Sequence, residues 1–506
     1  MQQMQRLWTS ESAHKEGTVE YVLSDYEEDI KRILYTDVRH TPSGAYGDAD
    51  ECVCIGSVEY HVVYQSSLGG VFGVRFSSEY EMVLDVPEDV EHTEGRVEVV
   101  SSSLRPVSSR KLMGKYALAA RCRGVKKESC TPLGDAMERE GTVLLPRTVH
   151  TSLYDTARTD EREYAEELCR SHTESKYLYY DADVRVERTA TASGGMIVSG
   201  VTLVRALAER EGEGIVAIEK RIPFEEFIVS EGEMDGCEAV GVGDVSSVTV
   251  TERREEDEYV SVVSVICRFT VHKLGHGCAT VVRDLYSTEY ETRVEYAERE
   301  CITEEHIASL SFPFEERVDR SVTESPEMEE VLLMGAEIRL HEVRAADKSV
   351  RCIGELTCNI LGRYADENGV SAYQKNTLKF PFDRTVAFAD AKDGMQLTPI
   401  RTTPRCRVWV DENELVVEGE MELVSYFTTR ESVRAVREGT VGEPLAKELG
   451  ADDIWILYPE TNLWEIAKEN HLSVAKICTD NGLKIAEEEM DDKDSIAAVS
   501  RLWIEA

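Results

Sequence analysis

The sequence lacks long apolar runs. No stretch reaches about 18 consecutive apolar residues, the length that a helix needs to span a bilayer. The N-terminal segment MQQMQRLWTSESAHKEG also has no apolar core of the kind found in signal peptides. We therefore expect a cytoplasmic protein without membrane insertion.

Paired cysteine motifs are also missing. The 13 cysteines are scattered and odd in number, and none belongs to a CxxC pair. Several, including Cys52, Cys267 and Cys352, lie inside apolar strand-like runs, where a thiol behaves as a small hydrophobic group. We expect neither a disulfide framework nor a zinc cluster.

Basic residues are scarce relative to acidic ones. The chain has 57 Lys and Arg against 97 Asp and Glu, a net charge of −40. Such a surface repels phosphate backbones and anionic lipids, so nucleic acid is not an expected partner. A protein partner would present a basic patch, and association would slow as the salt concentration rises.

Catalytic signatures are absent from the sequence as well. It contains no GxxxxGK[ST], HExxH or GxSxG motif and no kinase set. The segment HKLGHGC offers His272, His276 and Cys278, but this spacing on a strand and turn does not suit a helical pair of ligands. No fourth ligand is near in sequence. We expect no metal, no cofactor and no active site.

What the chain does contain is a pattern that occurs three times. A strand ends in glycine, a second strand follows, and a Pro-Phe pair comes after a loop. Subtracting positions 56, 200 and 354 gives spacings of 144 and 154 residues, the size of whole domains. In the first copy, Ser77 and Ser78 stand in place of Pro-Phe. The marks of the pattern are Gly56, Gly200, Pro223, Phe224, Gly354, Pro381 and Phe382.

These marks have structural interpretations. Apolar and polar residues alternate around them, which predicts antiparallel sheet with one solvated face. A glycine inside a strand indicates a bulge or a close approach of two backbones. The proline suits the first residue of a strand, which needs no ladder donor, and the phenylalanine would fill the core.

The pattern divides the chain into repeats and connectors. We predict mainly β repeats at residues 21–125, 170–290 and 325–432. Residues 126–180 and 285–330 are interpreted as connectors. In the first connector, the spacing of the apolar residues in REYAEELCRSHTE favours a helix.

The C-terminal residues 450–506 have a different pattern. IWILY reads as a short strand, and Asn462 with a glutamate three residues on forms a capping box for a helix. Ser473 can cap a second helix, which Asn481 and Gly482 end. With a closing strand at LWI, this predicts a small α+β module of strand, helix, helix and strand.

This module resembles a LysM domain. The matching residues are Tyr458, the run Leu463-Trp464-Glu465-Ile466-Ala467, Ser473-Val474 and Asn481-Gly482-Leu483. In that family the loops flanking the helices bind N-acetylglucosamine chains. The resemblance implies that ligand or partner contacts come from Glu460, Thr461, Asn462, Leu463, Trp464, Asn481 and Gly482. Trp464 has two interpretations, core packing or an aromatic contact with a sugar or partner.

The three β-repeats resemble the SPOCS domain of endospore-forming bacteria. Three such repeats followed by one LysM module is the layout of SipL-type spore-coat morphogenetic proteins. The resemblance implies a non-enzymatic scaffold, located in the mother cell at the forespore surface, that docks on a coat-basement ATPase or another coat protein. One alternative is a peptidoglycan-binding protein that acts through the LysM module. A third reading is a cell-wall hydrolase.

Overall fold

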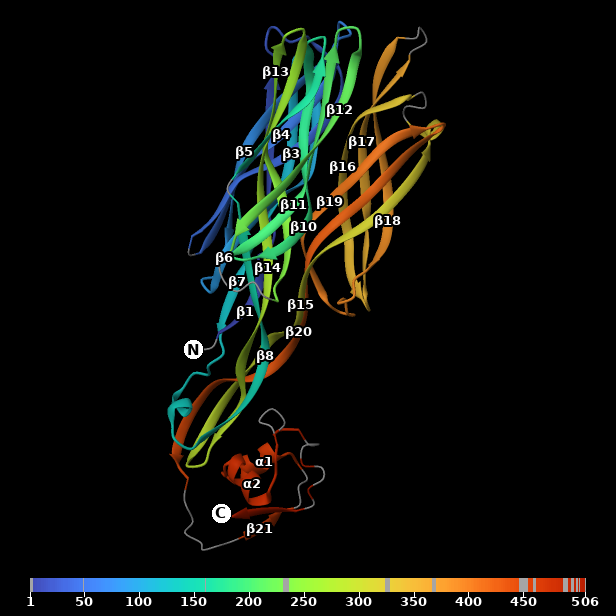
Figure 1. The fold of residues 1–506 in the computed structure, drawn as a ribbon. Helices are drawn as coiled ribbons and strands as arrows, with labels where there is room; N and C mark the ends of the chain where they lie inside the picture. Colours follow the sequence, from blue (N-terminus) through green and yellow to red (C-terminus); the bar gives the residue numbers. More distant parts are fainter. Residues whose placement is uncertain are drawn as a thin grey trace.

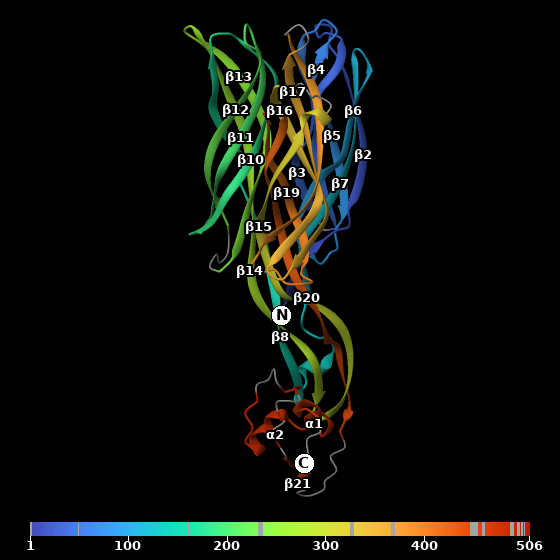
Figure 2. The same ribbon diagram turned by 90° about the vertical axis from the view of Figure 1, so that its right-hand side faces the viewer.

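The computed structural model is elongated and built mostly of antiparallel strands, which confirms the mainly β class predicted from the sequence. A wide bundle of long strands narrows into a stalk, and a small helical module lies at the tip of the stalk (Figures 1 and 2). The structure describes residues 3–48, 50–159, 161–230, 236–323, 328–365, 370–445, 454–457, 461–485, 490–492, 496, 499 and 501–505. Across these ranges, no helix is long and apolar enough to cross a membrane.

Three meanders of three strands make up most of the wide end (Figure 1). In each, the middle strand is the most buried and pairs with both neighbours. The first meander contains β3 (Ile30–Asp48), β4 (Glu51–Ser66) and β5 (Val71–Asp85). The second contains β10 (Ser175–Ala192), β11 (Gly195–Arg210) and β12 (Gly214–Val229). The third contains β16 (Glu330–Ala346), β17 (Ser349–Ala365) and β18 (Ser371–Ala387).

The three meanders share one apolar cluster. Each contributes a residue from its first strand and the residue paired with it on the middle strand. These pairs are Tyr35 with Val63, Tyr179 with Leu207, and Leu333 with Leu361. All six side chains are buried. Because equivalent positions meet, burial at this place couples the three meanders to one another.

A hairpin follows each meander and is closed by strands that precede that meander. The hairpins are β6 (Val90–Ser108) with β7 (Lys111–Ser129), β13 (Glu238–Glu255) with β14 (Glu258–Ser287), and β19 (Gln396–Asp411) with β20 (Glu414–Pro444). The closing strands are β1 (Gln3–Thr9) and β2 (Ala13–Val22) on β7, β8 (Thr142–Arg158) and β9 (Arg162–Ser171) on β14, and β15 (Tyr290–Asp319) on β20. The order of closing strands, meander and hairpin therefore occurs three times, with β15 alone in place of two closing strands in the third. We call each of these three sets a unit.

This pairing changes the interpretation of the connectors. Most of residues 126–180 and 285–330 is strand that pairs with the last strand of the following hairpin. The helix expected in REYAEELCRSHTE is wrong, because β9 occupies that segment. Tyr164 and Leu168 are four residues apart, and that spacing places two side chains on one face of a strand as well as of a helix.

The repeat glycines lie where two backbones approach closely, as predicted. A Cβ on Gly200 would lie 1.9 Å from the carbonyl oxygen of Arg185, and one on Gly354 would lie 2.4 Å from that of Arg339. In each case the first strand has a bulge next to this contact. Gly56 repeats the arrangement, with the Thr41 carbonyl oxygen at 2.6 Å.

An aromatic ring from the third strand covers each of these glycines. Phe224 pairs with Gly200 and Phe382 with Gly354. Tyr80 pairs with Gly56, so the expectation that Ser77 and Ser78 replace Pro-Phe is wrong. A ring can lie flat over a glycine because no side chain occupies that place on the sheet.

The prolines do not begin strands, contrary to the sequence-based prediction. Pro223 lies well inside β12 and Pro381 well inside β18. Both strands are at the edge of their three-stranded sheets, and an edge strand tolerates a residue without a backbone N–H.

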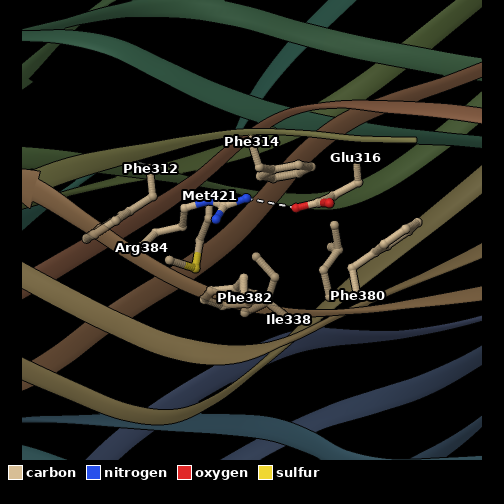
Figure 3. A pocket seen from close by; sticks show the side chains of 9 residues that line it. Phe312, Phe314, Glu316, Ile338, Phe380, Phe382, Arg384 and Met421 are labelled. Atoms are coloured by element: carbon tan, nitrogen blue, oxygen red, sulfur yellow. Dashed lines mark hydrogen bonds and ion pairs between the residues drawn. The ribbon is translucent and has the colours of Figure 1, made fainter. Parts of the chain in front are cut away.

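Phenylalanine fills the core as predicted in the second meander, where Phe224 is 6% exposed and its ring centroid lies 4.6 Å from that of Phe269. In the third, Phe382 is half-buried and lines a narrow apolar pocket with Phe312, Phe314 and Ile338 (Figure 3). An ion pair between Arg384 and Glu316, 2.7 Å long, lies among these rings (Figure 3).

Candidate functional site at the C-terminal module

The module contains α1 (Leu463–Glu469) and α2 (Val474–Asn481), with β21 (Ile454–Leu457) paired antiparallel to β22 (Leu502–Glu505). The order strand, helix, helix, strand is the order expected from the sequence. Asn462 caps α1, and its side chain accepts a hydrogen bond of 2.9 Å from the backbone N–H of Glu465. Gly482 ends α2 in the left-handed conformation, with φ of 65°.

The buried face of the helices packs on the tip of the stalk. Leu463 and Trp464 of α1 are fully buried and share one apolar cluster with Val474 and Ile477 of α2. Tyr286 of β14 and Leu145 of β8 belong to the same cluster. The module and the stalk therefore have a common core.

Asp284 of β14 is the polar centre of this contact. Its carboxylate accepts hydrogen bonds from Trp464 Nε1 at 2.8 Å and Lys468 Nζ at 2.6 Å, both on α1. Tyr296 of β15 donates a third at 2.7 Å. Burial opposes ionisation, but these donors outweigh it and hold the pKa of Asp284 below its usual value.

Further contacts fix the orientation of the module. The ring of Tyr286 meets that of Trp464 edge to face at 5.0 Å between centroids. The Tyr286 hydroxyl donates to the carbonyl oxygen of Leu472 at 2.6 Å, and His471 Nδ1 lies 3.2 Å from the carbonyl oxygen of Ser287. One face of α1 and the turn after it are thus occupied by the chain itself.

The structure places the predicted contact residues in different surroundings. Leu463 and Trp464 are buried, which supports the core-packing interpretation of the tryptophan. Asn481 joins α2 to β22, because its side chain accepts from the N–H of Trp503 and donates to its carbonyl oxygen. Thr461 is exposed beside the helix cap. Glu460 and Tyr458 lie outside the described residues.

The module retains an outward surface on α2. Its exposed residues are Ala475, Lys476, Thr479 and Asp480. This short patch has one apolar, one hydroxyl and two oppositely charged side chains. None of these four side chains is aromatic, so this face of α2 offers no ring on which a sugar could stack.

A second polar feature lies where the three units meet. A cleft of about 340 Å³ is lined by Arg96, Arg123, Arg158, Arg268 and Arg401. Each guanidinium already has a partner, either a carboxylate or, for Arg123, the carbonyl oxygen of Pro399. Two of these ion pairs, Arg158 with Glu94 and Arg401 with Asp244, join different units, so we interpret the cleft as a polar contact between units and not as an anion site.

Sequence reasoning missed the role of the stalk in this site. Asp284 and Tyr286 occur in a stretch whose only visible signal is β alternation. The conspicuous residue was Trp464, whose partner could not be read from the sequence. No protein-family model, curated protein or solved structure matches the chain.

Proposed function

We propose that this protein is a non-enzymatic scaffold for the assembly of the spore coat, and that its C-terminal module docks on a coat-basement ATPase. The resemblance to SPOCS and LysM domains motivates the proposal. The supporting observation is the fixed attachment of the module to the stalk through Trp464, Lys468 and Asp284. A module held rigidly at one end of a long β-body transmits position from its partner to the rest of the molecule.

The burial of the predicted sugar contacts favours a protein partner over a glycan. Leu463 and Trp464 face the stalk, and Asn481 is hydrogen-bonded to β22. The outward face of α2 is the surface through which we propose that the partner docks. The alternative of peptidoglycan binding would rely on Thr461 and on the exposed ring of Trp503, beside Asn481, and not on the buried Trp464.

The charge of the chain determines what kind of partner surface fits. With a net charge of −40, a partner that presents a basic patch gains in association rate at low salt. We expect the association to slow between low and physiological ionic strength, because screening shortens the range of this attraction. The proposed location is the mother-cell cytoplasm at the forespore surface.

The test is binding of the purified full chain to a purified coat-basement ATPase. We expect saturable binding that the substitutions Ala475→Arg and Thr479→Arg weaken, since both place bulk on the outer face of α2. Glu219→Arg is the matched control, because this exposed residue of β12 lies on the wide bundle and not on the module.

Two results would count against the proposal. The first is that the folded chain does not bind the ATPase at any salt concentration. The second is that the chain pellets saturably with purified peptidoglycan and N-acetylglucosamine oligomers release it, which would favour the glycan-binding alternative. A hydrolase would instead release reducing sugars or free amines from the same material.

A further inference from the structure

Two histidines and a glutamate from three strands converge in the stalk. His150 belongs to β8, His276 to β14 and Glu305 to β15. One ligand atom from each lies within 4.8 Å of the other two. His276 had attracted attention in the sequence with His272 and Cys278. The structure places His272 apart, buried against Tyr154, whereas Cys278 pairs with His150 across β14 and β8.

The separations of the three ligand atoms match one face of a tetrahedron around a small ion. His150 Nε2 lies 3.3 Å from His276 Nδ1 and 3.4 Å from Glu305 Oε1. His276 Nδ1 and Glu305 Oε1 are 3.8 Å apart. Tetrahedral bonds of about 2.0–2.1 Å place ligand atoms about 3.3–3.4 Å apart, whereas octahedral bonds of that length give about 2.9 Å. The longest edge belongs to His276, the most exposed of the three side chains, whose ring can turn toward an ion.

Glu305 supplies an independent indication of a ligand. Its side chain has no exposed surface, and its Oε1 atom has no hydrogen-bond partner among the described residues. The other oxygen, Oε2, accepts a hydrogen bond from the Tyr426 hydroxyl, which orients the carboxylate. A buried carboxylate oxygen without a hydrogen-bond donor is costly, and a bound cation offsets that cost.

The two imidazoles leave a path to solvent. The His150 side chain is 26% exposed and that of His276 is 37% exposed, so the fourth side of the tetrahedron faces outward. Two imidazoles and one carboxylate with an open position is a donor set that suits zinc. The acidic surface of the chain raises the local concentration of cations.

We propose that His150, His276 and Glu305 form a Zn²⁺ site that ties the second unit of the chain to the third. β8 and β14 belong to the second unit, whereas β15 belongs to the third. β8 and β15 are paired at His150 and Ile302, beside the proposed ion. The bound ion cross-links β8 and β14 to β15.

The first test measures binding of Zn²⁺ alone to the full chain after removal of metal with EDTA. Calorimetry in physiological salt with excess Mg²⁺ suppresses weak binding to surface carboxylates. We expect one Zn²⁺ per chain and, with Co²⁺ as a probe, the intense visible absorption of tetrahedral coordination. Failure to bind Zn²⁺, or a weak octahedral Co²⁺ spectrum, would overturn the proposal.

Variants identify the ligands. Glu305→Gln and His150→Gln each remove one ligand, and we expect affinity losses beyond the roughly 10–100-fold that outer-shell changes cost. Tyr426→Phe removes the group that orients Glu305, so its loss should fall within that range. His172→Ala is the control, because its imidazole is 83% exposed and lies beside Glu258, which is the first residue of β14 and precedes His276 by 18 residues in that strand. Unchanged affinity in both Gln variants would show that Zn²⁺ binds elsewhere.

Thermal unfolding distinguishes a metal site from a simple ion pair between histidine and glutamate. Zn²⁺ should raise the Tm of the natural sequence and leave that of Glu305→Gln unchanged. Without metal, Glu305→Gln should be at least as stable as the natural sequence, because the substitution removes a buried carboxylate oxygen that lacks a hydrogen-bond donor. A lower metal-free Tm in Glu305→Gln, without a Zn²⁺ response in the natural sequence, would establish the ion pair and exclude the metal.

Discussion

Replacing Asp284 by alanine should release the C-terminal module from the stalk. The substitution removes the acceptor of the two hydrogen bonds that join α1 to Asp284, from Trp464 and Lys468. A hydrogen bond to a charged group contributes about 1.5–3 kcal/mol. The Lys468 side chain is 30% exposed and regains water, so its share is discounted. We expect docking to weaken by about 2–4 kcal/mol in total.

Thiol trapping at the interface measures this change. Leu145 lies under the module and is 4% exposed, so a Leu145→Cys thiol reacts with a soluble reagent when the module undocks. The rate of reaction is then proportional to the undocked fraction. A weakening of 2–4 kcal/mol corresponds to an acceleration of about 30- to 700-fold. The exposed native Cys278 provides an internal reference rate.

The control and the refuting result are defined by the same assay. Asp383→Ala removes an exposed carboxylate on β18 that pairs with Arg351, and it should leave the rate at Leu145→Cys within about twofold. If Asp284→Ala accelerates the reaction no more than this control does, the carboxylate does not hold the module. The contacts of Trp464 with Tyr286 would then have to carry the docking alone.

Three other outcomes follow from the structure. Gly354→Ala should lower the free energy of unfolding in urea by about 2 kcal/mol or more, because its Cβ meets the Arg339 carbonyl oxygen at 2.4 Å, whereas Gly44→Ala has nothing within 4 Å and should cost less than half as much. Burial lowers the pKa of His272 to about 4, so the unfolded chain takes up a proton that the native chain does not, and stability should fall by about 3 kcal/mol as pH drops from about 6.5 through 4. When the free energy of unfolding in urea is measured across this pH range, His272→Gln should remove most of the decrease. An unchanged pH dependence would mean that the pKa of His272 is not lowered in the native state. Cys278 should react with a thiol reagent in the native state before the other twelve cysteines, which are buried or half-buried. Peptide mapping that finds one of those twelve modified first would contradict the burial pattern.

Local features of the fold could be predicted from the sequence because their causes are local. Alternation gave the strands, and the bulge beside Gly200 follows from what glycine permits in a strand. The cap at Asn462 and the left-handed Gly482 follow from side-chain chemistry within a few residues.

The features that were missed depend on distant partners. The closing strands pair across 88 residues (Ser171 with Tyr259) to 154 residues (Tyr290 with Pro444), and alternation does not say with which strand a segment pairs. Tyr80 was overlooked because the search followed the letters Pro-Phe, whereas the physical requirement is a ring opposite Gly56. Of the triad of His150, His276 and Glu305, the sequence drew attention only to His276, because each ligand comes from a different strand.

The closing strands also determine when each unit can be completed during synthesis. Gln3 pairs with Ser129, Thr142 with Ser287, and Tyr290 with Pro444. The first strand of a unit therefore leaves the ribosome long before its partner exists, and it must wait unpaired. Units are finished one at a time in chain order, and such long-range pairing is slow. A nascent chain stalled before Glu414, the first residue of β20, would contain two finished units and β15, with the edge that pairs with β20 open to a neighbouring copy.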